Sequence, residues 1–334
     1  MAVGKRLLVL TRDRAGASFR HRIEPYLEPL AGQGIASEVM ELARSPLVRR
    51  GQWRQAREFG GILMHRKTLT AWDAWALESI GVRRLIYDFD DTILYQASAP
   101  AEPHPARLRR FQRTMARADL VVAGSPILAE WAQREGARRV AVVPTGLDVR
   151  RFRPKTNYET AGPLRLVWIG SASTLKQLEP LRSMLEAIGR AFPQAVLRII
   201  ADAPLTVQGL RVENFPWSLQ TEARLLAESD IGISPLPDTP YTRGKCGFKV
   251  LQYMAAGLPT VVSPVGVNAE YVERCVTGFH ARTSQDWVAA IQRLAGDAAL
   301  RERLGRAGRM RICGEYDFSA LIPKVTNLLG EAMA

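Results

Sequence analysis

The chain has 334 residues, of which 47% are hydrophobic and 24% charged, and its net charge at pH 7 is +13. This length exceeds one typical core and predicts two domains. The composition is that of a globular protein. No apolar run approaches the length needed to span a bilayer, so we do not expect the chain to be an integral membrane protein. Three cysteines without metal-ligand spacing, Cys246, Cys275 and Cys313, favour a reduced, cytoplasmic compartment.

The positive charge is concentrated in the first half of the chain. Residues 1–154 hold 26 Lys and Arg against 16 Asp and Glu, a net of +10, whereas residues 155–334 hold 20 against 17, a net of +3. In RLRRFQRTMAR, Leu108, Phe111 and Met115 share one helical face among arginines, as in an amphipathic basic helix. Such a helix is either merely solvated or attracted to an anionic membrane or a phosphorylated acceptor. No nucleic-acid-binding motif accompanies the charge, so we expect no nucleic-acid partner.

Short apolar runs alternate with helical patterns throughout the sequence. In the first half, buried strands are predicted at RLLVL, GILM, RRLIY, LVVAG and VAVVP. After Pro154 the pattern restarts, and strands are predicted at LRLVWIG, VLRIIA, DIGISPL and PTVVS. Helices are predicted between them at about 176–190, 219–228, 246–256, 285–295 and 298–310.

Strands that alternate with helices imply parallel sheets covered on both faces. The sequence therefore predicts an α/β protein with two doubly wound, Rossmann-like domains, residues 1–154 and 155–314, joined near the proline-bounded polar segment 149–163. A C-terminal helix at about 315–334 is expected to pack back on the first domain. Because ligands of such sheets bind beyond the carboxyl ends of the strands, we expect the site in a cleft between the domains.

The segment LIYDFDDTIL, residues 85–94, places three carboxylates at the end of a strand. Asp88, Asp90 and Thr92 match the D-x-D-x-T signature of haloacid-dehalogenase-type phosphatases, in which the first aspartate is the nucleophile and magnesium is bound beside it. Such enzymes also need a downstream acidic pair. The Gly296-Asp297 pair instead has Arg301 at the position of the second acid. A phosphatase is therefore only the alternative.

The segment RGKCGFKVLQYMAAGLPTVVS, residues 243–263, is the most informative. Gly244 and Gly247 loosen a loop that enters a helix, and Gly257 with Pro259 ends that helix before a strand. A helix N-terminus surrounded by Arg243, Lys245 and Lys249 suits a diphosphate, since unpaired N–H groups and the helix dipole favour an anion there. A basic surface turn is the other interpretation.

Four segments together resemble the family 4 retaining glycosyltransferases of the two-Rossmann-domain (GT-B) type. They are VVPTGLDVRRFRP, LVWIGSASTLKQLEPL, ESDIGISPLPDT and YMAAGLPTVVSPVGVNAEYVERCVTGF, and the resemblance runs from about Val140 to Leu328. It implies transfer of a sugar, with retention and without a metal, from a nucleoside-diphosphate sugar to a lipid-linked or saccharide acceptor. A divergent branch associated with surface-polysaccharide biosynthesis is the most similar part of the family.

One departure from the family pattern concerns the donor. Family members usually carry two glutamates that hold the donor sugar and the ribose, and the corresponding positions here are Gly244 and Gln252. Gln252 can still bond a ribose hydroxyl, whereas Gly244 offers no side chain. Lys245 and Lys249 are present instead. A non-catalytic nucleotide-sugar-binding protein is therefore a further alternative.

The family resemblance and the charge pattern together suggest a set of site residues. Those expected to act in catalysis are Lys249, Arg243, Asp90 and Asp91, the last two as possible partners of an acceptor hydroxyl or of Arg20 or Arg22. Those expected to bind the donor are Gly170, Ser171, Lys176, Trp217, Lys245 and Gln252. Those expected on the acceptor side are Gly16, Ala17, Ser18, Arg20 and His65, with Arg20, His21 and Arg22 beginning a helix.

The implied partners are a nucleotide sugar, a lipid-linked or saccharide acceptor and an anionic membrane surface bound by the basic first half. We expect no cofactor other than the nucleotide sugar as co-substrate, no metal, and a cytoplasmic location, peripheral on the inner face of the membrane.

Overall fold

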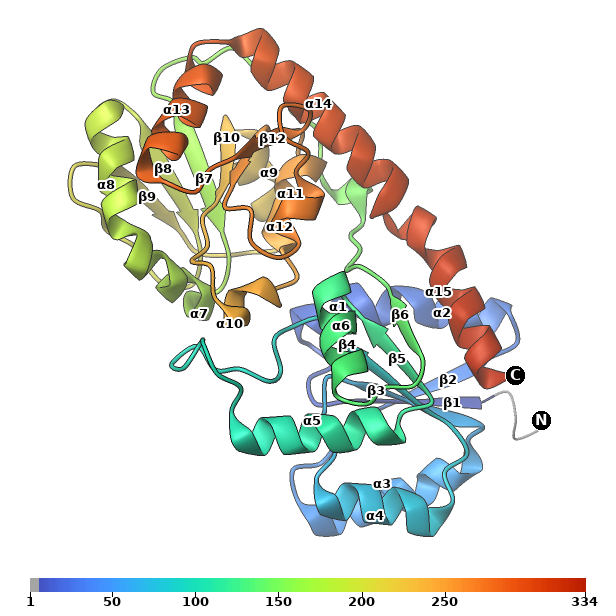
Figure 1. Ribbon diagram of the computed structural model, residues 1–334. Helices are drawn as coiled ribbons and strands as arrows, with labels where there is room; N and C mark the ends of the chain where they lie inside the picture. The colour runs from blue at the N-terminus through green and yellow to red at the C-terminus, as the bar shows by residue number, and fades with distance from the viewer. Residues whose placement is uncertain (1–5) are drawn as a thin grey trace. The chain divides into compact units, whose positions relative to one another are not determined.

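A computed structural model describes residues 6–334 and divides them into two compact units (Figure 1). Unit 1 consists of the described residues up to Gly146, with Thr239–Cys246 and Phe318–Ala334. Unit 2 consists of Leu147–Asp238 and Gly247–Asp317. The chain therefore passes between the units four times, and the first passage follows Gly146, eight residues before the predicted boundary.

The described part of unit 1 is built on a six-stranded parallel sheet with the order β2-β1-β3-β4-β5-β6. The strands are β1 (Arg6–Thr11), β2 (Ala36–Glu41), β3 (Gly61–His65), β4 (Leu85–Phe89), β5 (Leu120–Ala123) and β6 (Val140–Val142). The chain winds outward in both directions from β1 and β3, so the switch point of the sheet lies between these two strands. Ligands of open α/β sheets bind beyond the carboxyl ends of the strands at such a point.

Helices cover both faces of this sheet. They are α1 (Ala17–Arg22), α2 (Glu24–Gly32), α3 (Pro46–Gln55), the 3₁₀ turn η2 (Ala56–Glu58), α4 (Ala71–Ile80), α5 (Pro105–Arg117), α6 (Pro126–Arg134), α10 (Pro240–Arg243) and α15 (Phe318–Met333). One core contains Trp53, Phe89 and Phe111, and the core on the other face contains Phe19 and Leu321. Both faces of the sheet are therefore buried under helices, as is usual for a parallel sheet.

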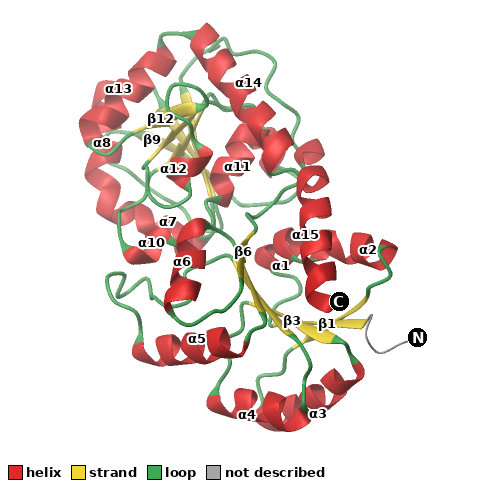
Figure 2. Cartoon of the chain, turned by 45° about the vertical axis from the view of Figure 1, so that its right-hand side comes forward, coloured by secondary structure: helices red, strands yellow, loops and turns green. Residues whose placement is uncertain are grey.

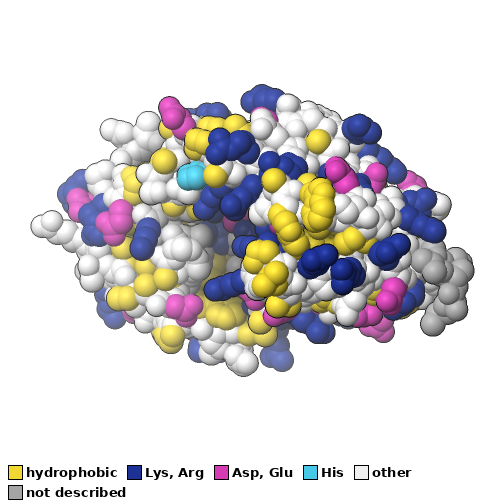
Figure 3. Space-filling view, turned by 90° about the horizontal axis from the view of Figure 1, so that it is seen from below, with side chains coloured by type: hydrophobic (Ala, Val, Ile, Leu, Met, Phe, Trp, Pro, Cys, Tyr) yellow, Lys and Arg dark blue, Asp and Glu magenta, His cyan; other side chains and the backbone are white. Residues whose placement is uncertain are grey.

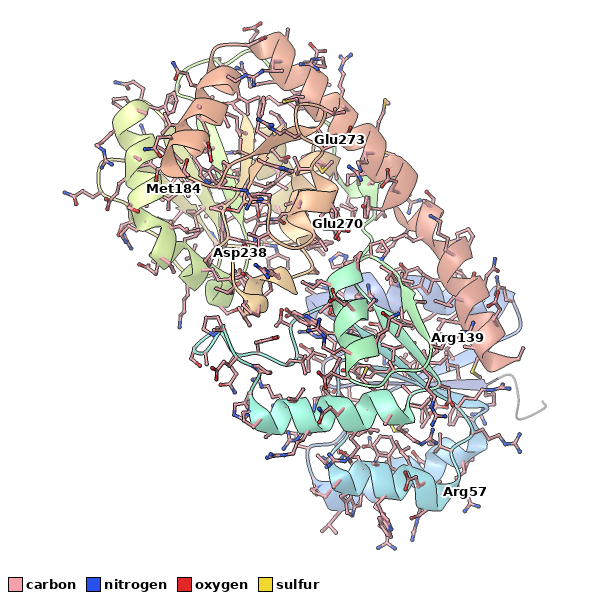
Figure 4. All side chains as sticks on the ribbon, viewed as in Figure 1. Arg57, Arg139, Met184, Asp238, Glu270 and Glu273 are labelled. Carbon is pink, nitrogen blue, oxygen red and sulfur yellow. The ribbon has the colours of Figure 1, made fainter. Side chains whose placement is uncertain are left out.

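The C-terminal helix α15 lies beside α2 in both ribbon views (Figures 1 and 2). The rings of Tyr26 and Phe318 meet edge to face with centroids 6.2 Å apart. The Gln33 amide donates to Thr326 Oγ1 at 3.0 Å. Arg139, labelled in Figure 4, pairs with Glu331 at 3.2 Å. Residues from the far end of the chain thus complete the core of unit 1.

The basic amphipathic helix predicted at 107–117 is α5. Its apolar face belongs to the core of its own unit, because Phe111 and Met115 are fully buried and Leu108 packs against the same cluster. The apolar face is therefore not available to a membrane, and attraction of the arginines of α5 to an anionic surface stays a prediction.

The described part of unit 2 also has a six-stranded parallel sheet, with the order β12-β11-β10-β7-β8-β9. The strands are β7 (Arg165–Ile169), β8 (Val196–Ile200), β9 (Arg211–Phe215), β10 (Ile231–Ser234), β11 (Thr260–Val262) and β12 (Gly278–His280). This is the strand order of the dinucleotide-binding fold, whose switch point here lies between β7 and β10.

Helices again cover both faces of the sheet in unit 2. They are the 3₁₀ turn η3 (Val149–Arg151), α7 (Ala172–Leu175), the 3₁₀ turn η4 (Lys176–Leu181), α8 (Arg182–Ala191), α9 (Glu222–Ala227), α11 (Phe248–Ala255), α12 (Asn268–Tyr271), α13 (Ser284–Ala295) and α14 (Ala298–Glu315). Trp168 and Trp287 are buried in one core, and Tyr253 and Met254 in the other. Within residues 6–334, no helix is both long and apolar enough to cross a membrane.

Candidate functional site

The switch point of unit 1 holds a chain of polar side chains. Thr11 ends β1 and His65 ends β3, and Thr11 Oγ1 lies 3.2 Å from His65 Nδ1. On the other side of the ring, His65 Nε2 lies 2.9 Å from Ser18 Oγ, and Ser18 donates to Asp90 Oδ1 at 2.9 Å. The predicted acceptor-side residues Ser18 and His65 are therefore in contact.

The proton positions in this chain follow from its chemistry. Ser18 has one hydroxyl proton, which Asp90 accepts, so Ser18 Oγ must accept from His65 Nε2–H. His65 Nδ1 then accepts from Thr11. Burial lowers the pKa of His65, although Asp88 and Asp90 oppose this. The imidazole is therefore neutral at pH 7 and links Thr11 to Asp90.

Arg22 and Asp88 form a buried, two-pronged ion pair beside this chain. Arg22 Nε donates to Asp88 Oδ1 at 3.1 Å and its NH2 to Asp88 Oδ2 at 2.5 Å, and its NH1 donates to the Val143 carbonyl at 2.7 Å. The two side chains are 2% and 4% exposed. Both oxygens of Asp88 are thus engaged by a guanidinium. This geometry does not suit the phosphatase alternative, which needs Asp88 as an accessible nucleophile.

Asp90 and Asp91 differ in their surroundings. The Asp90 side chain is 5% exposed and lies 3.6 Å from Arg66. Burial alone would raise the pKa of Asp90, but Arg66 and Arg22 outweigh it and hold that pKa below its usual value. Asp91 is 27% exposed and accepts from Arg66 at 2.9 Å and from Lys245 at 2.8 Å. Asp91 is therefore the more accessible of the two predicted catalytic carboxylates.

Arg20 and Arg22 differ from expectation in their place on α1. This helix begins at Ala17, so Arg20, His21 and Arg22 occupy its last turn and not its first. Their positive charge is favourable there, because the helix dipole is negative at a helix C-terminus. Gly16 is the N-cap residue, and a Cβ there would meet the Asp13 carboxylate at 2.5 Å.

The segment Thr239–Cys246 packs with unit 1 and carries two of the predicted donor-side cations, Arg243 and Lys245. Its backbone is held at Tyr241, whose carbonyl accepts from Thr92 Oγ1 at 2.6 Å and whose N–H donates to the Pro100 carbonyl at 3.1 Å. Lys245 lies 4.3 Å from the ring centroid of Tyr241. Burial would lower the pKa of Lys245, but Asp91 and Tyr241 raise it, so the ammonium stays charged.

Position 244, where the family carries a glutamate, has no room for a side chain. A Cβ at Gly244 would meet Thr92 Oγ1 at 2.6 Å and the Trp131 ring at 2.8 Å. Contacts this short do not occur between unstrained atoms, so the neighbouring Trp131 accounts for the glycine in physical terms.

In unit 2 the loop after β7 contains Gly170 and Ser171, and Lys176 follows α7. The Gly170 N–H donates to the Ile200 carbonyl at 3.1 Å, so this predicted diphosphate donor is already used in the sheet. The Ser171 side chain caps α7 by accepting from Thr174 N at 3.3 Å. Lys176 is exposed at the end of α7.

Lys249 lies in the first turn of α11. Its Nζ is 4.9 Å from the centroid of the ring of Trp168, a residue near the carboxyl end of β7. The N-cap residue, Gly247, has φ 60°, a left-handed conformation that other residues rarely adopt. The backbone therefore turns sharply into α11 and brings Lys249 to the switch-point side of unit 2.

Gln252 and Trp217 meet at a carboxylate that the sequence did not single out. Trp217 Nε1 donates to Glu222 Oε2 at 2.9 Å, and Gln252 Nε2 donates to the same oxygen at 3.1 Å. Arg151 donates to Glu222 Oε1 at 3.0 Å, and Glu222 is 3% exposed. The Gln252 amide is thus committed to Glu222. The only advance signal was that Glu222 opens a helix five residues after Trp217.

A pocket of about 370 Å³ lies beside the carboxyl ends of β10 and β11. Its lining includes Met184 and Asp238, labelled in Figure 4, together with Ser263 and Trp287. Its volume is in the range of small-molecule sites. Among residues 6–334, no group of three or more His, Cys, Asp or Glu side chains is arranged to hold a metal ion.

Comparison with known proteins identifies the fold and a related family. Residues 163–297 match the family described as glycosyl transferases group 1. Sucrose-phosphate synthase from Thermosynechococcus elongatus superposes with a TM-score of 0.75 at 16% identity, covering 98% of both chains. The Anabaena protein Alr3699/HepE, solved with UDP and glucose, superposes with a TM-score of 0.73 at 18% identity, covering 98% of this chain and all of the other. The two-unit α/β fold is therefore of the predicted GT-B type.

Sequence relatives agree with the family match. The chain is 28% identical over 175 residues to a GDP-mannose-dependent α-(1-6)-phosphatidylinositol dimannoside mannosyltransferase from Mycobacterium tuberculosis, covering 48% of this chain and 45% of the relative. The chain spans about half the length of the curated relatives it matches. The similarity to group 1 glycosyltransferases is therefore strongest in unit 2, which contains most of the matched residues.

Proposed function

We propose that this protein is a glycosyltransferase that moves a sugar from a nucleoside-diphosphate sugar to a lipid-linked or saccharide acceptor in cell-surface glycan synthesis. The observation that carries the proposal is the family match over residues 163–297, which covers the switch point of a dinucleotide-type sheet. A mannosyltransferase relative named for a phosphatidylinositol dimannoside and a GT-B neighbour solved with UDP support the same chemistry. Retention of anomeric configuration is part of the proposal and rests on the family resemblance.

Lys249 is the proposed ligand of the leaving diphosphate. It stands in the first turn of α11, where the helix dipole favours an anion, and the pocket at β10 and β11 belongs to the same unit. A fixed cation there stabilises the charge that develops as the bond to the sugar breaks. We propose that Lys249 supplies this charge in unit 2 without a metal, and that no other cofactor is needed.

The donor site can be tested by calorimetry with UDP, GDP and ADP. We expect one of them to bind, and we expect Lys249→Ala to weaken it by about tenfold or more, the usual loss for a charge-assisted contact. The matched control is Lys324→Ala, an exposed lysine on α15 in unit 1. Equal affinities of Lys249→Ala and the native protein would remove the diphosphate assignment.

Turnover separates the proposal from its alternatives. A glycosyltransferase releases nucleoside diphosphate when donor and acceptor are both present, whereas a binding protein releases none. A phosphatase hydrolyses a simple phosphate ester with magnesium, and that activity would disappear in Asp88→Asn. Ester hydrolysis without any response to nucleotide sugars would refute the proposed function.

We also propose that the protein works at the cytoplasmic face of a membrane, through the surface of α3 and α4. Three exposed hydrophobic side chains lie on these two adjacent helices, with Leu47 84%, Val48 58% and Trp75 59% exposed. Exposed arginines of α3 and η2 accompany them at positions 50, 54 and 57, and Arg57 is labelled in Figure 4. The face of the molecule in Figure 3 likewise mixes hydrophobic side chains with Lys and Arg.

Apolar side chains beside arginines favour insertion among anionic headgroups. Flotation with phosphatidylglycerol vesicles should therefore recover the native protein in low salt but lose Trp75→Ser and Arg54→Gln. The control is Met310→Ser, a residue of unit 2 that is 76% exposed. If the unit 1 variants float as well as the native protein, this surface does not bind membranes.

A further inference from the structure

A pocket of about 360 Å³ lies in unit 1 at the point where its sheet reverses direction. It is bounded by Thr11 and His65 at the carboxyl ends of β1 and β3, by Ser18 and Phe19 of α1, and by the cationic pair Arg12 and Lys67. Its volume is enough for a phosphorylated sugar or polyol. Its described lining belongs to unit 1, whereas the proposed diphosphate ligand Lys249 belongs to unit 2.

The charges around this pocket are unequal. The lining contains three cations, Arg12, Arg66 and Lys67, and one carboxylate, Asp13. Arg66 is paired with Asp90 and Asp91. This arrangement leaves Arg12 and Lys67 as the positive side of the pocket.

The surroundings of Lys67 do not balance its charge. Its ammonium is 3.5 Å from Asp73, but that carboxylate also accepts from Arg49 at 2.9 Å and from Trp53. Two buried cations thus share one anion. Burial, assisted by Arg12 and Arg49 and opposed by Asp73, lowers the pKa of Lys67 to about 8. Lys67 is 6% exposed, so solvent does little to screen it.

The backbone directs these side chains to the pocket. Arg66 has φ 58°, in the left-handed region where residues other than glycine are uncommon. Its N–H donates to the Asp88 carbonyl at 2.7 Å, and Lys67 N–H donates to the His65 carbonyl at 2.7 Å. This tight turn directly after β3 brings Arg66 and Lys67 beside His65.

The neutral groups in the pocket are already committed. The hydroxyl protons of Thr11 and Ser18 and the His65 N–H are used in the chain that ends at Asp90. Recognition of a ligand therefore falls to Arg12 and Lys67. Paired cations with excess positive charge select an anion with several acceptor oxygens, and phosphate matches this best.

We propose that this pocket binds a phosphate group carried by the acceptor, with Arg12 and Lys67 as its ligands. The proposal rests on the proposed function only in naming the bound molecule as the acceptor. It restricts the acceptor class to phosphorylated molecules, either a soluble phosphate ester or the headgroup of a phospholipid.

The phosphate assignment of the pocket is tested by measuring, with calorimetry, the binding of inorganic phosphate to the full chain. The Lys249→Ala background removes the proposed diphosphate ligand of unit 2. We expect Arg12→Gln and Lys67→Gln to weaken phosphate binding by about tenfold or more, the usual loss of a charge-assisted contact. The matched control is Arg14→Gln, an exposed arginine of the same loop that does not line the pocket. Unchanged binding in Arg12→Gln, or an equal loss in Arg14→Gln, overturns the proposal.

Two further arms deal with folding and with the source of the phosphate. Lys67→Gln alters a buried ion-pair network and could prevent folding. Arg12 is exposed, so Arg12→Gln alone decides the test if Lys67→Gln does not fold. Competition by glycerol phosphate assigns a soluble ester, and competition by phosphatidate vesicles alone assigns a lipid headgroup. Competition by neither overturns the proposal.

Binding of UDP, GDP or ADP is measured on chains that keep Lys249, with and without Arg12→Gln. Loss of nucleotide binding with intact, Arg12-dependent phosphate binding would refute the proposed function and leave the pocket. Intact nucleotide binding without Arg12-dependent phosphate binding would refute the phosphate pocket and leave the proposed function standing.

Discussion

Replacing Arg22 by methionine should strongly destabilise unit 1. Arg22 and Asp88 are nearly fully buried, and both oxygens of Asp88 accept from the guanidinium. Arg22→Met leaves a buried carboxylate without its counter-charge, which costs about 3–5 kcal/mol of unfolding free energy. With a urea dependence of about 2 kcal/mol per molar, the unfolding midpoint of unit 1 should fall by roughly 2 M.

Hydrogen exchange in urea, read by mass spectrometry on peptides from β1 and β4, follows unit 1 separately from unit 2. The double variant Arg22→Met/Asp88→Leu should recover most of the loss, because replacing both charges by apolar groups removes the stranded carboxylate. If Arg22→Met costs less than about 1 kcal/mol, the pair contributes no more than a surface ion pair and the reasoning is wrong.

Three further predictions concern the same unit. Burial lowers the pKa of His65 below its ordinary 6.5, so as the pH falls the unfolded state binds a proton at this residue before the folded state does. The unfolding free energy should therefore decrease between pH 7 and about pH 5.5. Urea titrations of His65→Gln should lack this part of the pH dependence. Gly244→Ala should lower the thermal midpoint, since overpacking against Thr92 and Trp131 costs about 1–3 kcal/mol, whereas Gly51→Ala, with open space in α3, should raise it; equal shifts would contradict the crowding. Asp91→Asn removes the ion pair of Lys245, so trypsin should cut at 243–245 faster than in the native protein, and an unchanged rate would show that the pair does not hold the segment.

The strands in the interior of both sheets could be predicted from the sequence. β1, β3, β4 and β7 are mostly apolar segments that are buried on both faces, and such segments stand out against their neighbours. The edge strands β2, β9 and β12 were not predicted, whereas β6, the fourth edge strand of the described sheets, was predicted from its apolar residues. The sequences of β2 and β9, ASEVME and RVENF, are half-exposed and polar, so neither carries a continuous apolar signal.

The candidate site could be predicted only in part for a similar reason. Ser18, His65 and Asp90 follow strands or open helices, so their positions at the carboxyl edge of a sheet could be inferred from chain order. Glu222 takes its importance from Gln252, 30 residues further along the chain, and Lys67 from Asp73, which lies on the next helix. Pairings of this kind depend on how elements pack and leave no local pattern.

The eight residues from Thr239 to Cys246 have a consequence for how such enzymes could be recombined. They interrupt the stretch of chain that forms unit 2, yet they complete unit 1 through Asp91, Thr92 and Trp131. A chimera that exchanges residues 147–317 to acquire another donor would import a foreign version of this segment and misfit the recipient's unit 1. Successful exchanges should therefore keep the native 239–246 or replace position 131 together with 244. The two units therefore cannot be exchanged as independent segments of sequence.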